Sequence, residues 1–343
     1  MEKIVKQVVG IDVAQKELVV ALGRMYENWC LELYAHKTFA NTAKGFEALT
    51  TWVGKQTDLS ITTRFVMEAT GVYHESLAYY LDELGLPVSV VLPNKISNFS
   101  RTLDIKTITD KTSSESIARF GLERNLENWK RPNDVYKKLR QLSRERNQLV
   151  AERTMVKNEL HAEKSEAEPN QRSIARIKKR IDLLNKQEKE IKTEISDLVQ
   201  AHEESKKVTN LICSVPGVGL LTAVAVLSET NGFDLIRNKR QLASYAGLDV
   251  KDKQSGTSVK GKPRISKQGN KHLRKAMHLP ALSAIRHDER FKAVFTRIVQ
   301  KHGIKMKAAV AVQRKLLEMI FTVYKTGMIY DKNYLTRVVE LAS

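Results

Sequence analysis

The sequence is poor in cysteine and contains no long apolar run. Its two cysteines, Cys30 and Cys213, lie far apart and in no ligand spacing such as C-x-x-C, which excludes a disulfide framework and a cysteine-based zinc site. The first residues include no apolar stretch with a small-residue cleavage site, and no apolar run approaches the roughly 18 residues of a membrane span. We therefore expect a soluble, cytoplasmic protein with no membrane partner.

Acidic residues are also in deficit. The chain of 343 residues has 58 Lys and Arg against 39 Asp and Glu, which leaves a formal net charge of +19. Such an excess favours polyanionic partners, because each neutralised phosphate releases counterions without any need for a sequence match. The alternatives are a basic protein that is simply very soluble, or one that binds acidic lipid surfaces.

The first part of the chain alternates between strand and helix patterns. Residues 5–38 predict three short strands separated by polar turns, and Asn41 is expected to cap the helix that follows. A strand ending at Glu68, an amphipathic helix ending at Gly85 and a short apolar strand come next. This order is the one expected of a ribonuclease H-like α/β domain.

The middle of the chain lacks glycine. Between residues 135 and 206 Pro169 is the one proline, and the composition shifts to Lys, Arg, Glu, Gln and Leu. Apolar residues recur there at spacings typical of a coiled coil: Leu139, Leu142, Leu149, Val156, Leu160, Ile174, Ile177, Ile181, Leu184, Ile191, Ile195 and Leu198. Two long helices joined around residues 165–171 are implied, either folded back on each other or paired between subunits.

A glycine turn opens the last part of the chain. Gly217 and Gly219 lie between two predicted helices, in a pattern similar to a helix-hairpin-helix whose backbone N–H groups approach a phosphate. A glycine turn between two buried helices would give the same pattern. The remainder of the chain is expected to be mainly helical.

Three acidic residues are placed to share one site. Asp12 ends the first predicted strand and Glu68 the fourth, and in a sheet of this topology these strand ends lie side by side. Asp110 precedes a helix that could bring a third carboxylate to the same edge. Carboxylates suit Mg²⁺ or Mn²⁺, and three of them could support two-metal activation of a phosphodiester. Alternatively, Asp12 caps a turn, Glu68 pairs with a lysine and Asp110 caps its helix.

A basic segment surrounds one serine. Between Lys251 and Lys275 there are nine Lys or Arg and a single acid, Asp252, with Ser255 followed by Gly256. Positive charge around a serine favours its alkoxide and a developing phosphorane, so Ser255 is a candidate nucleophile; the alternative is a flexible phosphate-binding loop. We expect nucleic acid to contact Lys251, Lys253, Lys260, Lys262, Arg264, Lys267, Lys271 and Arg274.

These motifs occur together in one order: GIDVA with Asp12, MEATGVYH with Glu68, TDKTSSESIA with Asp110, VPGVGLLTA, and the segment from ASYAGLDV to HLRKA. In combination they resemble the DEDD-type insertion-sequence transposases of the IS110 family, relatives of the Piv-type invertases. The resemblance implies a RuvC-like domain at residues 1–130, a coiled-coil connector at 131–206 and a C-terminal transposase domain at 207–343.

The resemblance also implies a mechanism. A serine matching Ser255 becomes joined to DNA while the carboxylates and Mg²⁺ complete the site, and a structured bridge RNA encoded by the element pairs with target and donor DNA. A homo-oligomer, dimer or tetramer, is expected. One position departs from the family pattern, which has a fourth acid three residues after the third: here Ser113 stands in that place. Ser113 could offer a neutral metal ligand or hold a metal-bound water.

Two other functions compete with recombination. A metal-dependent, RuvC-like junction endonuclease would use the same carboxylates to hydrolyse DNA, with Ser255 only contacting phosphate. A non-enzymatic nucleic-acid scaffold would use the carboxylates structurally and break no strand. The first rival predicts no covalent intermediate, and the second predicts binding that is insensitive to Mg²⁺ removal.

Overall fold

The structure is a computed structural model that describes residues 2–69, 71–103, 107, 109–234, 236–251, 254–255, 259–260 and 264–333, with the side chains of residues 254, 255, 259 and 260 left out. The chain divides into two compact units, Met1–Arg131 and Pro132–Ser343. Each unit has its own hydrophobic core, and each is described by itself.

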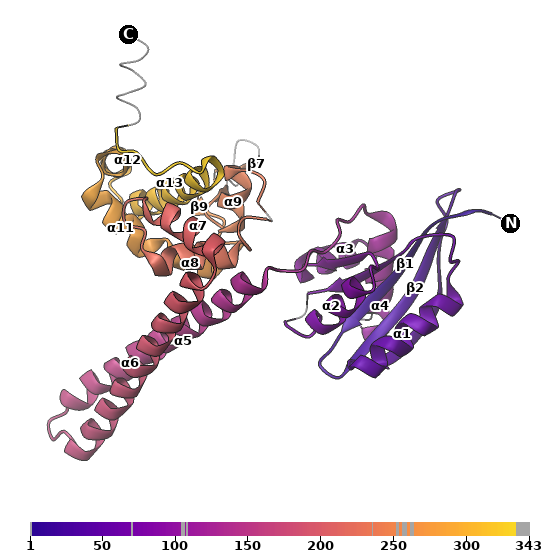
Figure 1. Cartoon of the computed structure of the whole chain (residues 1–343), viewed down its shortest axis with the longest axis horizontal. Helices are drawn as coiled ribbons and strands as arrows, with labels where there is room; N and C mark the ends of the chain where they lie inside the picture. Colours follow the sequence, from indigo (N-terminus) through magenta and orange to yellow (C-terminus); the bar gives the residue numbers. More distant parts are fainter. Residues whose placement is uncertain are drawn as a thin grey trace, which may run out of the picture. The chain divides into compact units, whose positions relative to one another are not determined.

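The N-terminal unit is built on a five-stranded sheet in the order β3-β2-β1-β4-β5 (Figure 1). Its strands are β1 (Ile4–Val13), β2 (Glu17–Tyr26), β3 (Leu31–Ala40), β4 (Thr63–Glu68) and β5 (Val88–Val91). The first three strands pair antiparallel, while β4 pairs parallel with β1 and β5 pairs parallel with β4. This mixed order is the ribonuclease H-like arrangement that the sequence predicted.

Helices cover both faces of this sheet. They are α1 (Ala43–Gln56), α2 (Glu75–Glu83), α3 (Pro93–Ser100), the short 3₁₀ helix Arg101–Leu103, and α4 (Asp110–Glu123). Apolar residues of α1 and α2 share one cluster with Val9 and Ile11 of β1, whereas α3 and α4 share the opposite cluster with Val8. Because successive strand residues point to opposite faces, β1 is apolar on both sides, as a buried central strand requires.

The start of α1 differs from the sequence prediction. Thr42, not Asn41, is the N-cap, and its hydroxyl accepts the hydrogen bond from the Gly45 N–H. The Asn41 amide instead donates to the carbonyls of Ala14 and Tyr73, at 2.9 Å and 3.2 Å. Asn41 is thus a brace between three loops, a role that depends on contacts distant in sequence.

The second unit begins with a helical hairpin. Its helices are α5 (Asp134–Lys164), α6 (Gln171–Gln200), α7 (Glu203–Cys213), α8 (Leu220–Glu229), α9 (Lys239–Tyr245), α10 (Lys271–Ala276), α11 (His278–His287), α12 (Glu289–His302) and α13 (Lys305–Thr326). The two long helices predicted from the apolar spacing are α5 and α6, and they pack against each other within one chain.

A buried ionic cluster joins the two long helices. Glu188 of α6 pairs with Arg146 and Arg153 of α5 and with Lys192 one turn along α6. Burial opposes ionisation of this carboxylate, but hydrogen bonds from Lys192 and Arg153 and the charge of Arg146 lower the pKa of Glu188 to about 2. Because the Glu188 carboxylate is buried, it needs Arg146 and Arg153 of α5 beside it. This requirement favours a single register of α6 against α5.

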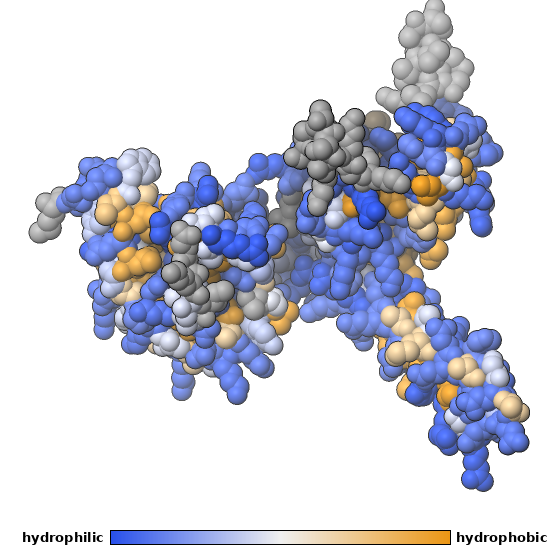
Figure 2. Space-filling model, turned by 180° about the vertical axis from the view of Figure 1, so that it is seen from behind, coloured by the Kyte–Doolittle hydropathy of each residue, from blue (hydrophilic) through white to orange (hydrophobic). Residues whose placement is uncertain are grey.

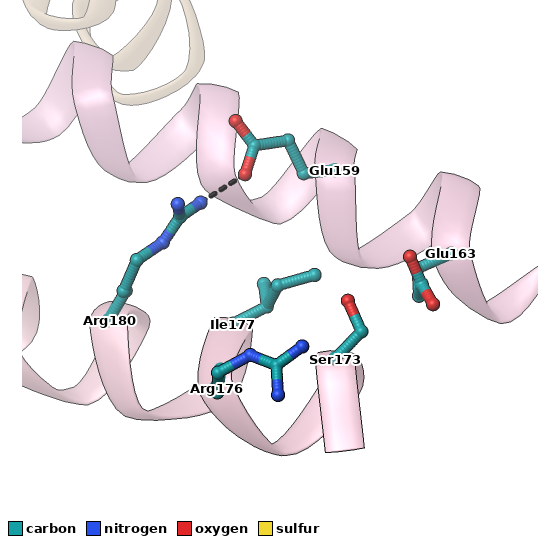
Figure 3. Close-up of a pocket in the computed structure, with 6 residues that line it drawn as sticks. All are labelled: Glu159, Glu163, Ser173, Arg176, Ile177 and Arg180. Carbon is teal, nitrogen blue, oxygen red and sulfur yellow. Dashed lines mark hydrogen bonds and ion pairs between the residues drawn. The ribbon is translucent and has the colours of Figure 1, made fainter. Parts of the chain in front are cut away.

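A shallow groove lies nearer the end of this hairpin (Figure 3). There Arg180 of α6 pairs with Glu159 of α5, and the side chains of Ser173, Arg176 and Ile177 line the groove beside them. The polar lining is what a solvated coiled-coil surface presents.

The remaining helices enclose the core of the second unit around α13. Buried residues of α5, α6 and α8 belong to the same hydrophobic cluster as Val312 and Leu316 of α13. The hairpin is therefore continuous with the C-terminal helices. Division into three functional parts, at residues 130 and 206, stays a prediction. Two short ladders, β6 (Val250–Lys251) with β9 (Arg264–Ile265) and β7 (Gln254–Ser255) with β8 (Val259–Lys260), complete this unit.

Hydrophilic residues cover most of the visible surface of both units (Figure 2). None of the helices in the described part of the chain is both long and apolar enough to cross a membrane.

Candidate functional site

Asp12 and Glu68 end two neighbouring parallel strands. The register of β1 with β4 pairs Ile11 with Met67, so the next residue on each strand is a carboxylate. Asp12 shares its side of the sheet with Val8, and Glu68 shares it with Val66, because alternate strand residues face the same way. Val8 and Val66 both contribute to the cluster under α3 and α4. The two half-buried carboxylates therefore lie at one edge, on the face covered by α4.

Close packing of α4 on β1 brings the third carboxylate to this edge. Gly10 faces the helix so tightly that a Cβ there would lie 2.4 Å from the Ser114 carbonyl oxygen. About two turns further along α4, a Cβ at Gly121 would lie 2.7 Å from a methyl of Val8. The helix thus runs antiparallel to β1, from Gly121 beside Val8 to Ser114 beside Gly10. Its first residue, Asp110, follows at the Asp12 end.

The three carboxylates interact electrostatically. Burial, followed by the charge of Asp110, raises the pKa of Asp12, although a hydrogen bond from the Val13 backbone opposes the shift. Burial and the charge of Asp12 raise the pKa of Glu68. The charge of Asp12 is therefore felt by Glu68, and that of Asp110 by Asp12.

The donor set fits a hard divalent cation. Burial first, and then a neighbouring negative charge, raise the pKa values of Asp12 and Glu68, and a bound cation would favour their charged forms. Within the residues that the structure describes, no three His, Cys, Asp or Glu side chains already stand close enough together to enclose a metal ion. Asp110 is exposed at the start of α4.

Ser113 lies one turn beyond Asp110 and is half-buried. Residues three apart on a helix lie on the same side, so Ser113 borders the region that a fourth acid would occupy. The nearest acid in sequence, Glu115, instead approaches Lys111 on its own helix, with Oε1 3.9 Å from Nζ. Glu115 therefore does not substitute for the acid absent at residue 113.

The stretch from Val250 to Ile265 contains Ser255 and is called the serine segment; two short antiparallel ladders lie within it. Val250 and Lys251 pair with Ile265 and Arg264. Further out, Gln254 and Ser255 pair with Lys260 and Val259. The backbone of Ser255 thus lies at the outer end of a short ladder. Lys253 and Lys262 lie outside the described residues.

Two glycine turns hold the base of this segment. The Gly247 carbonyl accepts a hydrogen bond from the Lys267 N–H at 3.1 Å, and the Tyr245 carbonyl accepts one from the Asn270 N–H at 2.7 Å. A Cβ at Gly269 would lie 2.4 Å from the Tyr245 carbonyl oxygen. Gly247 and Gly269, with φ of 65° and 141°, supply conformations that other residues rarely adopt. The two ends of the segment are consequently fixed to each other.

A buried carboxylate anchors this base to the long helices. Glu229, 4% exposed, accepts two hydrogen bonds from the Arg144 guanidinium, both at 2.8 Å. It accepts a third from the Asn270 amide at 2.6 Å, while the Tyr245 hydroxyl donates to its backbone carbonyl. Burial opposes ionisation, but the hydrogen bonds from Arg144 and Asn270 lower the pKa of Glu229. This network left one signal in the sequence, a lone acid at the end of the apolar stretch LLTAVAVLSE.

The basic side chains predicted to bind nucleic acid divide into two groups. Lys251, Arg264, Lys267 and Lys271 are exposed. Arg274 is half-buried, and its guanidinium donates to the Ala246 carbonyl at 2.9 Å, which gives it a structural contact as well. The side chain of Lys260 lies outside the described part of the chain.

The turn between α7 and α8 contains both glycines predicted to approach phosphate. Gly217 has φ of +80°, and a Cβ there would lie 2.5 Å from the Pro280 carbonyl oxygen of α11. Packing against α11 accounts for this glycine without a ligand. Gly219 is the N-cap of α8, and a Cβ there would meet nothing within 4 Å. Of the two, Gly219 alone stays open to an approaching phosphate.

The chain matches known proteins over both units. A model for IS110-type DEDD transposases, described as "Transposase", matches residues 9–163, and one described as "Transposase IS116/IS110/IS902 family" matches residues 209–296. The pilin gene-inverting protein of Moraxella bovis is 29% identical over 95% of this chain and 98% of that protein. An uncharacterized 43.6 kDa protein of insertion element IS110 from Streptomyces coelicolor is 29% identical over 47% of this chain and 38% of that protein.

Among solved structures, RuvC of Thermus thermophilus aligns with 36% of this chain and 99% of its own, at 11% identity and a TM-score of 0.28. The two matched family regions include the three carboxylates in one unit and Ser255 in the other. The chain thus matches models of the IS110 family of DEDD transposases in both of its units.

Proposed function

We propose that this protein cuts and rejoins DNA through a covalent link between Ser255 and a DNA phosphate, with Asp12, Glu68 and Asp110 holding Mg²⁺ or Mn²⁺. The observation that supports it best is the coupling of Asp12 to both other carboxylates at one edge of the sheet. Carboxylates on a ribonuclease H-like sheet are suited to a divalent cation, which when bound would polarise a phosphodiester.

The serine supplies the nucleophile. Its Oγ forms a bond to phosphorus while one P–O bond to deoxyribose breaks, so the serine loses a proton and the released deoxyribose oxygen gains one. A hydroxyl of another strand then attacks the phosphoserine, and the serine recovers its proton. Since the phosphodiester energy is conserved in the linkage, rejoining needs no external energy source.

Assembly of the site requires both units. The carboxylates belong to the unit Met1–Arg131 and Ser255 to the unit Pro132–Ser343. The proposed chemistry therefore needs both units, from one subunit or from two subunits of a homo-oligomer, to act on the same phosphate. Cleavage would then be restrained until the complex is complete.

A structured bridge RNA completes the proposal by pairing with target and donor DNA. The formal net charge of +19 favours the binding of a second polyanion in addition to DNA. Base pairing would then supply the sequence choice, while exposed lysines and arginines contact the phosphates.

The test is denaturing electrophoresis after incubation of the full chain with Mg²⁺, element-end DNA and the element's non-coding RNA. A protein–DNA adduct in the wild type and none in Ser255→Ala is the expected result, with DNA binding nearly unchanged because one hydroxyl adds little to a many-phosphate interface. Cleavage without an adduct would establish the junction endonuclease instead. Binding without cleavage, unchanged by metal removal, would establish the scaffold.

A further inference from the structure

A basic groove lies between β3 and α1, and none of the three carboxylates is among its lining residues. It has a volume of about 470 Å³ and is lined by Lys37 of β3 and by residues of α1, among them Lys44, Ala48, Thr51, Trp52 and Lys55. Glu47 is the one acid in its lining. Among the residues that the structure describes, none of the three lysines forms an ion pair, so their charges face solvent.

The groove runs along one side of α1. On α1, Lys44, Ala48, Thr51 and Lys55 follow one another at spacings of four, three and four, which places them along one side of the helix. At 1.5 Å per residue the two lysines are about 16 Å apart along the axis, with small side chains between them. A DNA strand carries one phosphate per roughly 3.4 Å of duplex axis, so this length spans several phosphates.

Aromatic packing fixes the strand side of the groove. The Phe39 and Trp52 rings lie 5.6 Å apart between centroids, and the Lys37 Nζ lies 5.4 Å from the Phe39 centroid. Lys37 is therefore held over a packed aromatic pair rather than free to extend in any direction. Lys37 therefore has a fixed position on the β3 side of the groove, across from Lys44 and Lys55 of α1.

The groove lies on the sheet face opposite to the one that carries Asp12 and Glu68, but one of its ends reaches the same edge of the sheet. Because β1, β2 and β3 alternate in direction, β3 ends at the same edge of the sheet as Asp12. Lys44 lies in the first turn of α1 at that edge, and Lys55 lies in its last turn. Asn41, just before the helix, donates to carbonyls of Ala14 and Tyr73, in the segments that follow the two strand-end carboxylates.

We propose that this groove binds the sugar–phosphate backbone of the DNA that flanks the strand at the carboxylates. Neighbouring strands are about 4.8 Å apart, so the end of β3 lies about 10 Å from the end of β1 along the edge that they share. The inference rests on the proposed function for its ligand, but binding in the groove does not require any cleavage.

The first test is lysine acetylation of the wild-type full chain, with and without a mixed-sequence DNA duplex, read by mass spectrometry in EDTA. Lys44 and Lys55 should be protected by DNA, whereas Lys3 and Lys130, exposed elsewhere on the same unit, should react equally in both samples. Equal reactivity of all four would overturn the proposal. Protection by RNA of the same sequence but not by DNA would overturn the choice of ligand.

The second test compares two double variants with equal loss of charge. Lys44→Gln/Lys55→Gln should reduce the slope of log K against log salt by about 1.8 for duplex DNA, at about 0.9 per neutralised phosphate. Lys3→Gln/Lys130→Gln should leave the slope unchanged, and circular dichroism would verify that both variants fold. Equal slopes would contradict the groove. An absent serine adduct together with protected groove lysines would refute the proposed chemistry and leave the groove standing.

Discussion

Gly10 of β1 lies directly against the backbone of Ala118 in α4. A side-chain carbon on residue 10 would stand 2.2 Å from the Ala118 nitrogen, a distance that real Cβ atoms essentially never show. The absent side chain therefore sets how closely α4 approaches the sheet. Through α4 it also sets the position of Asp110 relative to Asp12.

Gly10→Ala should consequently separate α4 from β1. We expect a loss of about 1–3 kcal/mol in the free energy of unfolding, as is usual for overpacking, and weaker binding of Mg²⁺. Urea denaturation measures the first and calorimetric titration the second. Gly54→Ala is the matched control, because a Cβ there meets nothing within 4 Å and alanine favours the helix by up to about 1 kcal/mol. Unchanged Mg²⁺ affinity in Gly10→Ala would show that the packing of α4 on β1 does not position the carboxylates for metal binding.

Asp12→Asn should raise the melting temperature of the metal-free protein at pH 7. Burial and neighbouring charge raise the pKa of Asp12, and burial and Asp12 itself raise the pKa of Glu68. A group whose folded pKa is raised stabilises the fold when protonated, and this contribution is lost as pH rises through the folded pKa. The gain in Asp12→Asn should therefore shrink as the pH falls toward the ordinary carboxyl range near about 4.

Asp58→Asn should change the melting temperature in the opposite direction. Hydrogen bonds from the Ser60 hydroxyl and N–H lower the pKa of Asp58, so its charged form stabilises the fold and its removal should lower the melting temperature at pH 7. Thermal melts in EDTA across this pH range compare the two variants. A lower melting temperature for Asp12→Asn at pH 7 would show that its carboxylate is structural.

Much of this site could be predicted from sequence because its determinants are local. Asp12 and Glu68 each follow a run of β-branched or apolar residues, and strand order then makes them neighbours. The apolar spacing of α5 and α6 likewise predicts both helices without any knowledge of the rest of the chain.

Other features depend on contacts between distant residues and left little local signal. The Asn41 amide donates to the Tyr73 carbonyl, 32 residues away, and Thr42 caps α1 in place of Asn41. The Asn270 amide bonds to Glu229, 41 residues away, and nothing in the spacing of these two residues indicates a pair. Gly217 looked like a phosphate turn because a glycine that packs against a helix and one that faces a ligand are identical in sequence.

Exchanging the acid and the amide should restore the hydrogen bond between residues 229 and 270, with the loss of one Arg144 hydrogen bond, because Glu229 Oε2 accepts from both Arg144 and Asn270. Glu229→Gln leaves the Arg144 guanidinium without its carboxylate, and Asn270→Asp puts a second carboxylate 2.6 Å from the first. Each change alone should destabilise the protein. The double variant restores one acid and one amide, and Asp keeps the oxygen that caps α10. We expect a favourable coupling energy of about 0.5–3 kcal/mol from urea denaturation; strictly additive losses would contradict the network.

The basic segment should dominate the salt dependence of nucleic-acid binding. Replacing Arg264 or Lys267 by Gln, as well as Lys260 or Lys262, should flatten the slope of log K against log salt by about one unit for each phosphate that is no longer neutralised, similarly for all sequences. Arg274→Gln should mainly reduce stability instead, because its guanidinium is bonded to the Ala246 carbonyl. Fluorescence anisotropy at several salt concentrations measures the slope. An unchanged slope in all four variants would place the polyanion elsewhere.

Ser113→Asp should convert the site to the acidic pattern of the family. The added carboxylate lies one turn from Asp110, so in EDTA its repulsion should lower the melting temperature. With Mg²⁺ the same charge becomes a ligand or a partner for bound water, and the stabilisation by the metal, which grows with affinity, should exceed that of the wild type. Ser113→Asn, similar in size but neutral, controls for shape. The opposite effects with and without metal separate a change at the metal site from a general change in stability, and an equal Mg²⁺ shift in the Asp and Asn variants would mean that residue 113 lies too far from the metal to matter.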